Sequence, residues 1–111
     1  MSVEYAAIIC VGFKVTQEEV EKMRSMLDDE EFFDVYDEYL VAMDGWADSC
    51  DWIFYSDMSH VGEGNILSAS DLLRKVNDKK YKDFIATFNK YFPFVDKETH
   101  QLDVWIGLRV Y

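Results

Sequence analysis

Two segments near the ends of the chain alternate between two faces, as β-strands do. From Val3 to Val15 every second residue is apolar, and the intervening positions Ala6, Ile8 and Cys10 are apolar as well. This pattern predicts a central strand that is covered on both sides. The segment from Leu102 to Tyr111 shows the same alternation and predicts a final strand.

Two other segments have helical spacing and recognisable start signals. Thr16 and Glu19 form a capping box, and the apolar residues that follow predict a helix from Gln17 to about Leu27. Ser68 to Asp71 repeats the box before a longer apolar stripe, which ends just before Pro93. Asn77-Asp78 marks a break or a second start within that stripe.

The middle of the chain is more ambiguous. Four adjacent acids, Asp28 to Glu31, repel one another and predict an exposed corner. Asp37 to Met43 and Asp51 to Asp57 are rich in alternating β-formers and predict two strands, joined by a hairpin connection over 44–50. The alternative is that part of Phe32 to Met43 is helical. Ser59 to Asn65 is expected to be a flexible loop, and 96–99 a turn.

The order strand, helix, strand, strand, helix, strand predicts an α+β fold of the ferredoxin-like βαββαβ type, an antiparallel sheet with two helices on one face. The first and third strands are expected in the centre and the other two at the edges. With 111 residues, half of them apolar, the chain is expected to form a single compact domain over 1–111. The longest apolar run, Tyr5 to Val11, is too short to span a bilayer. The presence of only Cys10 and Cys50 favours a cytoplasmic location.

Charge changes this picture most. The formal net charge is −11, and 14 of the 22 acids lie between Glu18 and Asp57, with only Lys22 and Arg24 among them. Such a surface disfavours direct binding to nucleic acid or to an anionic membrane, because both require positive charge. It favours a basic protein partner, one that normally binds nucleic acid. The alternative is that the acids serve solubility only.

Aromatic residues are interspersed with these acids and would supply the anchors that charges alone do not provide. The alternative is that they complete the core, as we expect Phe33 and one of the tyrosines to do. The residues expected to contact a partner are Glu18, Glu21, Asp28, Asp29, Glu30, Glu31, Asp34, Tyr36, Asp37, Glu38, Trp46 and Asp48.

Catalytic or metal-binding chemistry has weaker support. His60, Asp57 and Tyr55 form the best catalytic candidate, since a histidine beside an aspartate can act as an acid or base. His100 lies in the turn before the last strand and is a weaker candidate. Asp44, Asp48 and Asp51 lack the spacing of a calcium loop, and the cysteines and histidines match no zinc pattern. We expect no metal and no cofactor.

The leading interpretation is a non-enzymatic inhibitor or interaction protein. In size, charge and lack of motifs the chain is similar to the small acidic proteins that phages use against host defences, such as DNA-mimic anti-restriction and anti-CRISPR proteins. This likeness is one of composition and assigns no residue a role. One alternative is an immunity protein or antitoxin against a basic toxin. Another is a small ferredoxin-like enzyme or ligand-binding protein with a site near His60, which would form a homodimer through its edge strands.

Overall fold

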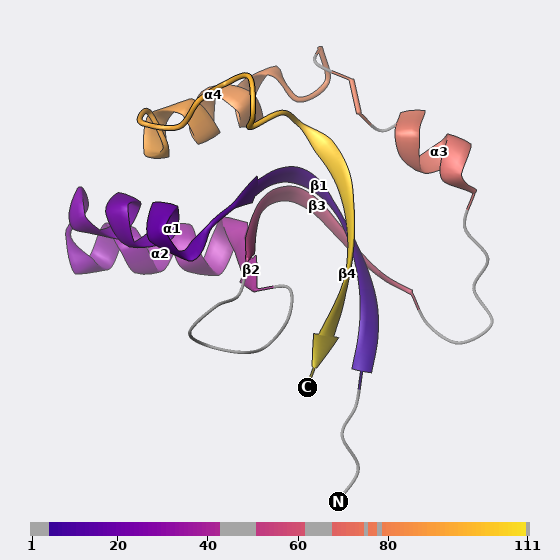
Figure 1. Ribbon diagram of the computed structural model, residues 1–111, viewed down its shortest axis with the longest axis horizontal. Coiled ribbons are helices and arrows are strands. Elements are labelled where there is room, and N and C mark those ends of the chain that lie inside the picture. The colour runs from indigo at the N-terminus through magenta and orange to yellow at the C-terminus, as the bar shows by residue number, and fades with distance from the viewer. Residues whose placement is uncertain (1–4, 43–50, 62–67, 75, 78, 111) are drawn as a thin grey trace, which may run out of the picture.

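The computed structural model describes residues 5–42, 51–61, 68–74, 76–77 and 79–110. Within these ranges the protein is an α+β fold with four helices and a four-stranded antiparallel sheet (Figure 1). Along the chain the elements are β1 (Tyr5–Val15), α1 (Gln17–Ser25), α2 (Asp29–Tyr39), β2 (Leu40–Ala42), β3 (Trp52–Val61), α3 (Ala69–Arg74), α4 (Lys82–Tyr91) and β4 (Asp103–Val110).

The sheet has the order β2-β3-β1-β4, so the predicted central and edge strands are confirmed. β1 pairs with β3 from Ala7 opposite Val61 to Val15 opposite Trp52, and on its other side it pairs with β4. β2 is short and pairs with only one end of β3. β1 is therefore a central strand that pairs with a neighbour on each side along most of its length.

Opposite Gly12, strand β3 contains a β-bulge, and the two backbones approach so closely that a side chain at position 12 would not fit. Val11 pairs with Asp57 and Gly12 with Tyr55, so β3 contains one extra residue at this point. A Cβ atom on Gly12 would lie 2.1 Å from the backbone oxygen of Phe54. The indole nitrogen of Trp105 donates a hydrogen bond to the Gly12 carbonyl at 2.9 Å. Glycine is required here by the close approach of the two backbones.

The main core lies between one face of the sheet and helices α1, α2 and α4. Figure 1 shows these three helices at the same side of the sheet, with α3 lying apart. The core is strongly aromatic: the Phe13 ring stacks on Phe88 with centroids 3.9 Å apart, and Phe54 contacts the rings around it. Its buried members are Val11, Phe13, Val15, Val20, Met23, Phe32, Val35, Leu40, Phe54, Tyr81, Phe84, Phe88 and Phe92.

The opposite face of the sheet carries a smaller cluster of Ile8, Cys10, Val41 and Ile53, with Tyr55, Met58 and Trp105 packed against it. Ile8 and Cys10 are both 0% exposed. The prediction that the first strand is buried on both sides is therefore confirmed at these positions.

Asp28 to Glu31 are exposed as predicted, but the prediction of a corner was wrong, because these acids begin α2. The Asp28 carboxylate accepts a hydrogen bond from the Glu31 backbone N–H at 2.8 Å and caps the helix. The free N–H groups of a first helical turn favour negative charge, so the run of acids stabilises the start of α2. The helix continues to Tyr39, and within the described part of the strand predicted over Asp37 to Met43, which ends at Ala42, only Leu40–Ala42 is strand.

Two other boundaries also differ from the sequence prediction. β3 continues to Val61, so Ser59 and His60 are strand and not loop. The long helical stripe is divided into α3 and α4, with a turn in which the Asn77 side chain accepts from the Lys79 N–H at 2.9 Å. The predicted connection over 44–50 and the rest of the predicted loop lie outside the described residues. The second predicted helix is thus two helices, whereas the first corresponds to α1 and is followed by α2, which was not predicted.

Candidate functional site

Helices α1 and α2 carry the acidic residues that the sequence assigns to partner binding. Trp46 and Asp48 lie outside the described residues. The other ten are exposed: Glu18 and Glu21 on α1, Asp28 before α2, and Asp29, Glu30, Glu31, Asp34, Tyr36, Asp37 and Glu38 on α2. We call the α2 acids Glu30, Glu31, Asp34, Asp37 and Glu38 the acidic face. All five are exposed, whereas Phe32 and Val35 of the same helix are buried; Glu30, Asp34 and Asp37 lie opposite these two residues, and Glu31 and Glu38 flank them.

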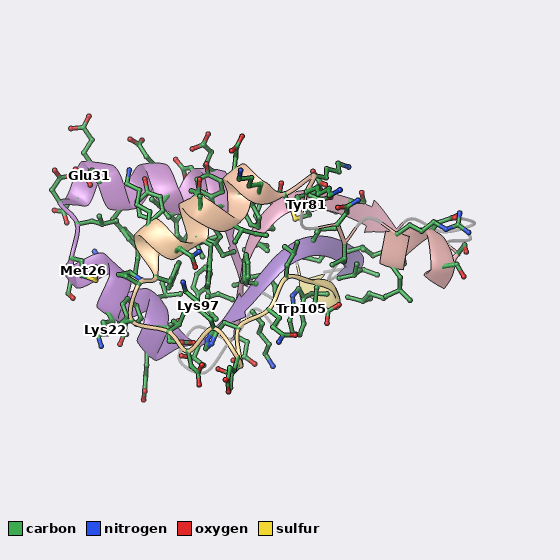
Figure 2. All side chains as sticks on the ribbon, turned by 90° about the horizontal axis from the view of Figure 1, so that it is seen from above. Lys22, Met26, Glu31, Tyr81, Lys97 and Trp105 are labelled. Atoms are coloured by element: carbon green, nitrogen blue, oxygen red, sulfur yellow. The ribbon has the colours of Figure 1, made fainter. Side chains whose placement is uncertain are left out.

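The acidic face takes part in no ion pair within the described ranges. The last turn of α2 contains no basic residue. Among the described residues the ion pairs are Lys14–Asp51, Arg74–Asp71 and His100–Glu19, and none of them involves α2. Figure 2 shows oxygen-tipped side chains projecting from the edge of α2, where Glu31 is labelled. The field of these carboxylates is therefore directed into solvent.

An aromatic groove lies beside the acidic face, between α1, α2 and the start of β3. It has a volume of about 300 Å³ and is lined by Gln17, Val20, Glu21, Arg24, Phe32, Phe33, Tyr36 and Trp52. Phe33 is 56% and Tyr36 41% exposed. The expectation that Phe33 completes the core was therefore wrong; the buried neighbour is Phe32, and the tyrosine that packs against the core is Tyr39.

The walls of this aromatic groove are held in place by contacts between α1, α2 and β3. The Trp52 indole N–H donates to the Gln17 side-chain oxygen at 2.6 Å. The Tyr36 ring meets the Trp52 ring edge-on with centroids 5.8 Å apart. Arg24 lies over the Phe32 ring at 4.9 Å, so this cation is already engaged within the protein. Phe33 and Tyr36 are left as the exposed aromatic surface of the groove.

The residues of the catalytic candidate are not brought together. Asp57 is opposite Val11 and lies on the helix-covered face, where its carboxylate accepts a hydrogen bond from the Tyr81 hydroxyl at 2.5 Å. His60 is opposite Ile8, and Tyr55 packs against the cluster on the other face. Alternation along β3, with its bulge, thus places Asp57 on one side of the sheet and the other two residues on the opposite side.

Burial and the Asp57 hydrogen bond raise the pKa of the Tyr81 hydroxyl to about 12, with the negative charge of Asp57 adding to the effect. Tyr81 therefore remains a neutral hydrogen-bond donor at physiological pH. Its ring belongs to the main core. The hydrogen bond between Tyr81 and Asp57 links β3 to the start of α4, and we interpret it as a structural contact.

A histidine contact that the sequence did not reveal joins the last turn to α1. The Nε2 atom of His100 lies 2.8 Å from a Glu19 carboxylate oxygen, with both side chains less than one-fifth exposed. Its Nδ1 lies 2.9 Å from the Asp96 carbonyl. The predicted capping box is confirmed, since Glu19 also accepts from the Thr16 N–H at 2.9 Å.

Glu19 is therefore held in its charged form. Burial acts to raise the pKa of its carboxyl, but the hydrogen bonds from the Thr16 backbone and His100 outweigh it, and the net effect lowers the pKa below its usual 4.5. The capping box could be read from sequence, whereas the contact with His100 could not, because it depends on how the turn folds back onto α1.

Cys10 is the cysteine that lies in the described part of the chain. Cys10 is buried, and burial raises the pKa of its thiol to about 11, which suppresses the reactive thiolate. No group of three or more potential metal ligands converges in the described ranges. None of the helices in those ranges is long and apolar enough to cross a bilayer. No family model, curated protein or solved structure matches the chain.

Proposed function

We propose that this protein is a non-enzymatic interaction protein, an inhibitor that docks its α1–α2 surface on the basic, nucleic-acid-binding site of a partner protein. The observation that carries the proposal is the acidic face beside the aromatic groove. Five exposed carboxylates, outside every ion pair of the described ranges, adjoin two exposed aromatic rings. Negative charge and exposed aromatic rings are thus combined on one surface.

The charge density of α2 supports a nucleic-acid-binding partner. Six acids lie within its 11 residues. At a rise of about 1.5 Å per residue this is roughly one negative charge per 2.7 Å of helix axis. Double-stranded DNA carries about one charge per 1.7 Å, and a single strand about one per 3.4 Å. A lysine- and arginine-lined site that accepts phosphates therefore meets a similar density of carboxylates on α2.

The aromatic groove is expected to slow the dissociation of such a complex. Exposed carboxylates at the rim mainly accelerate association, whereas desolvated aromatic residues slow dissociation. Phe33 and Tyr36 project next to the acids, so a guanidinium of the partner that pairs with a carboxylate would also lie near a ring face. This arrangement favours arginine over lysine on the partner side, because arginine both stacks and forms bidentate pairs.

The proposal includes the scaffold and the setting expected from the sequence. The sheet order suits a ferredoxin-like arrangement in which each crossover helix is replaced by a helix pair. A DNA-mimic role against host defences and a cytoplasmic location remain part of the proposal. The separation of Asp57 from His60 and Tyr55 removes the main support for an enzyme at that position.

The test is capture of partners from a host lysate, at low and at raised salt, followed by competition with duplex DNA. Three proteins are compared: the wild type, a variant with Glu30→Gln, Asp34→Asn, Asp37→Asn and Glu38→Gln, and a control with Asp71→Asn, Asp83→Asn, Glu98→Gln and Asp103→Asn. The two variants change the net charge equally but at different places.

We expect the wild type and the control to retain a basic protein that DNA displaces, and the acidic-face variant to lose it. Phe33→Ala with Tyr36→Ala should leave association fast but accelerate dissociation at least tenfold. The proposal is overturned if the two charge variants behave alike, or if the captured protein is not displaced by DNA.

A further inference from the structure

We infer a second, independent binding site in this protein: a cavity beside α4 that takes a small organic anion with an apolar body. The cavity has a volume of about 650 Å³, within the range of small-molecule sites. We call it the basic cavity. Its lining residues are Phe13, Lys82, Ile85, Asn89, Lys97, His100, Gln101 and Leu102.

Three separate parts of the chain build this cavity. Lys82, Ile85 and Asn89 are spaced by three and four residues and share one side of α4, next to the side that Phe84 and Phe88 bury in the core. The segment from Lys97 to Leu102 forms the opposite wall on its way to β4. Phe13 of β1 closes the floor and is itself held by stacking on Phe88.

The polar lining consists of cations and amides. Two lysines and the side-chain amides of Asn89 and Gln101 face the cavity together with His100, and no carboxylate is among the lining residues. This is the opposite of the chain as a whole, in which acids outnumber lysines and arginines 22 to 11. The lysines and the Asn89 amide can recognise a phosphate or a carboxylate, whereas the Gln101 amide nitrogen also donates to the Glu98 carbonyl at 3.4 Å.

His100 is positioned before any ligand arrives. One ring nitrogen is placed at 2.8 Å from Glu19 and the other at 2.9 Å from the Asp96 carbonyl, so the ring cannot rotate without losing both contacts. Since Glu19 faces His100, the two charges balance when the imidazole is protonated. The net positive charge of the cavity therefore comes from Lys82 and Lys97.

The apolar residues define the rest of the ligand. Phe13 is buried in the floor, and Ile85 and Leu102 are half-buried beside it. A phosphate or sulfate ion alone would leave this surface wetted. A molecule with an anionic head and a flat or aliphatic body satisfies the lysines and covers the apolar floor at once.

This site does not depend on the proposed partner surface. The aromatic groove and the basic cavity have no lining residue in common. In Figure 2 the labelled Lys97 lies on the segment between α4 and β4, away from Glu31 at the start of α2. Failure of one proposal therefore leaves the other unaffected.

The experiment is a titration followed by two-dimensional amide NMR, with four probes: phenyl phosphate, benzoate, benzylamine and inorganic phosphate. We expect phenyl phosphate or benzoate to shift the amides of residues 82–89 and 97–102 in a saturable manner. Whichever of the two binds more tightly identifies the head group. Benzylamine should bind at least tenfold more weakly, and inorganic phosphate should bind more weakly than phenyl phosphate.

Charge reversal provides the matched control. Lys97→Glu should weaken the binding of the better probe at least tenfold, whereas Lys79→Glu, at an exposed lysine outside the lining, should change it less than twofold. Folding of both variants is checked from the dispersion of the same spectra. Equal affinity for benzylamine and benzoate, shifts outside the cavity only, or equal effects of the two substitutions would overturn the inference.

Discussion

The acidic face and the basic cavity are two charged regions of opposite sign on the same fold. The acidic face is convex, and its five carboxylates come from consecutive turns of α2. The basic cavity is concave, and its cations are gathered from α4 and the turn before β4. Each region places apolar surface beside its charges: Phe33 and Tyr36 in the first, Phe13 with Ile85 and Leu102 in the second.

The difference between them lies in how they depend on the fold. The acidic face needs only one helix to form, so its charges can be exchanged with little structural cost. The basic cavity exists only when the turn at 97–100 closes over α4, because no single element carries its lining. A substitution in the central strands β1 and β3, on which both regions depend, should therefore disturb both. A substitution in a helix cap should disturb only one of them.

The largest effect on stability is expected for Gly12→Ala, because this substitution changes the pairing of the central strands β1 and β3. The added methyl group would overlap the backbone of Phe54, so β1 and β3 must separate or twist. Overpacking against backbone is expected to cost about 3 kcal/mol of unfolding free energy. Urea unfolding at pH 7 measures it. Ala86→Gly on the exposed side of α4 is the control, with an expected loss of about 1 kcal/mol. A loss below that of the control would contradict the bulge geometry.

Glu19→Ala is expected to have the next largest effect, because this carboxylate joins α1 to the wall of the basic cavity. At pH 7 the loss of its hydrogen bonds to Thr16 and His100 should cost about 2 kcal/mol. Glu19→Gln retains an acceptor for the Thr16 N–H and should cost less.

The pH dependence of the Glu19 effect has a definite sign. The folded-state pKa lies below the usual 4.5, so the charged form stabilises the fold at pH values above 4.5. That contribution is lost as the pH falls through the lowered folded-state value. The stability difference between the wild type and Glu19→Ala should accordingly narrow in unfolding curves recorded below pH 4.5. A difference that stays constant down to the folded-state value would rule out the charged carboxylate as its cause.

Asp28→Ala tests the acidic region alone. It removes the cap of α2 and should cost about 1 kcal/mol, while Asp28→Asn should stay within a few tenths of the wild type. Both variants lose the same charge, so thermal unfolding of the pair separates hydrogen bonding from electrostatics. The basic cavity should bind its probe equally well in both. If Asn and Ala are equally destabilising, the cap is not the reason for the acid at this position.

The smallest effect, and one of opposite sign, is expected on the acidic face. Glu30, Asp34 and Glu38 follow one another at four-residue spacing and repel. Conversion to Gln, Asn and Gln should raise stability by about 0.5 kcal/mol at low salt, and added salt should reduce this gain. A loss of stability would show that the fold requires these acids, which would favour a structural role over partner binding.

The two end strands and the first helix were predictable because their signals are local. Alternation from Val3 and the capping box at Thr16 need no tertiary information. The missed helix α2 carried a local signal as well: Asp28 with Glu31 three residues later resembles a capping pair, and Phe32, Val35 and Tyr39 have helical spacing. The four acids repel one another, but their attraction to the free N–H groups at the helix start outweighs this repulsion.

The candidate sites were predictable to different extents for the same reason. Exposure of the α2 acids follows from composition, whereas Phe33, which was expected in the core, is exposed and its neighbour Phe32 is buried. The basic cavity carries no sequence signal. Phe13, Lys82 and His100 lie on separate segments, and their convergence follows from sheet order and from the path of the turn.

The alkylation rate of Cys10 can report on transient opening of the sheet. Its thiol is fully enclosed on the face opposite the helices and stays protonated up to a pKa of about 11. In a Cys50→Ser background an alkylating reagent can reach this sulfur only during transient opening of that face. At high reagent concentration the labelling rate then equals the opening rate, and at low concentration it measures the fraction of open molecules. A single native thiol thus separates how often the sheet opens from how long it stays open.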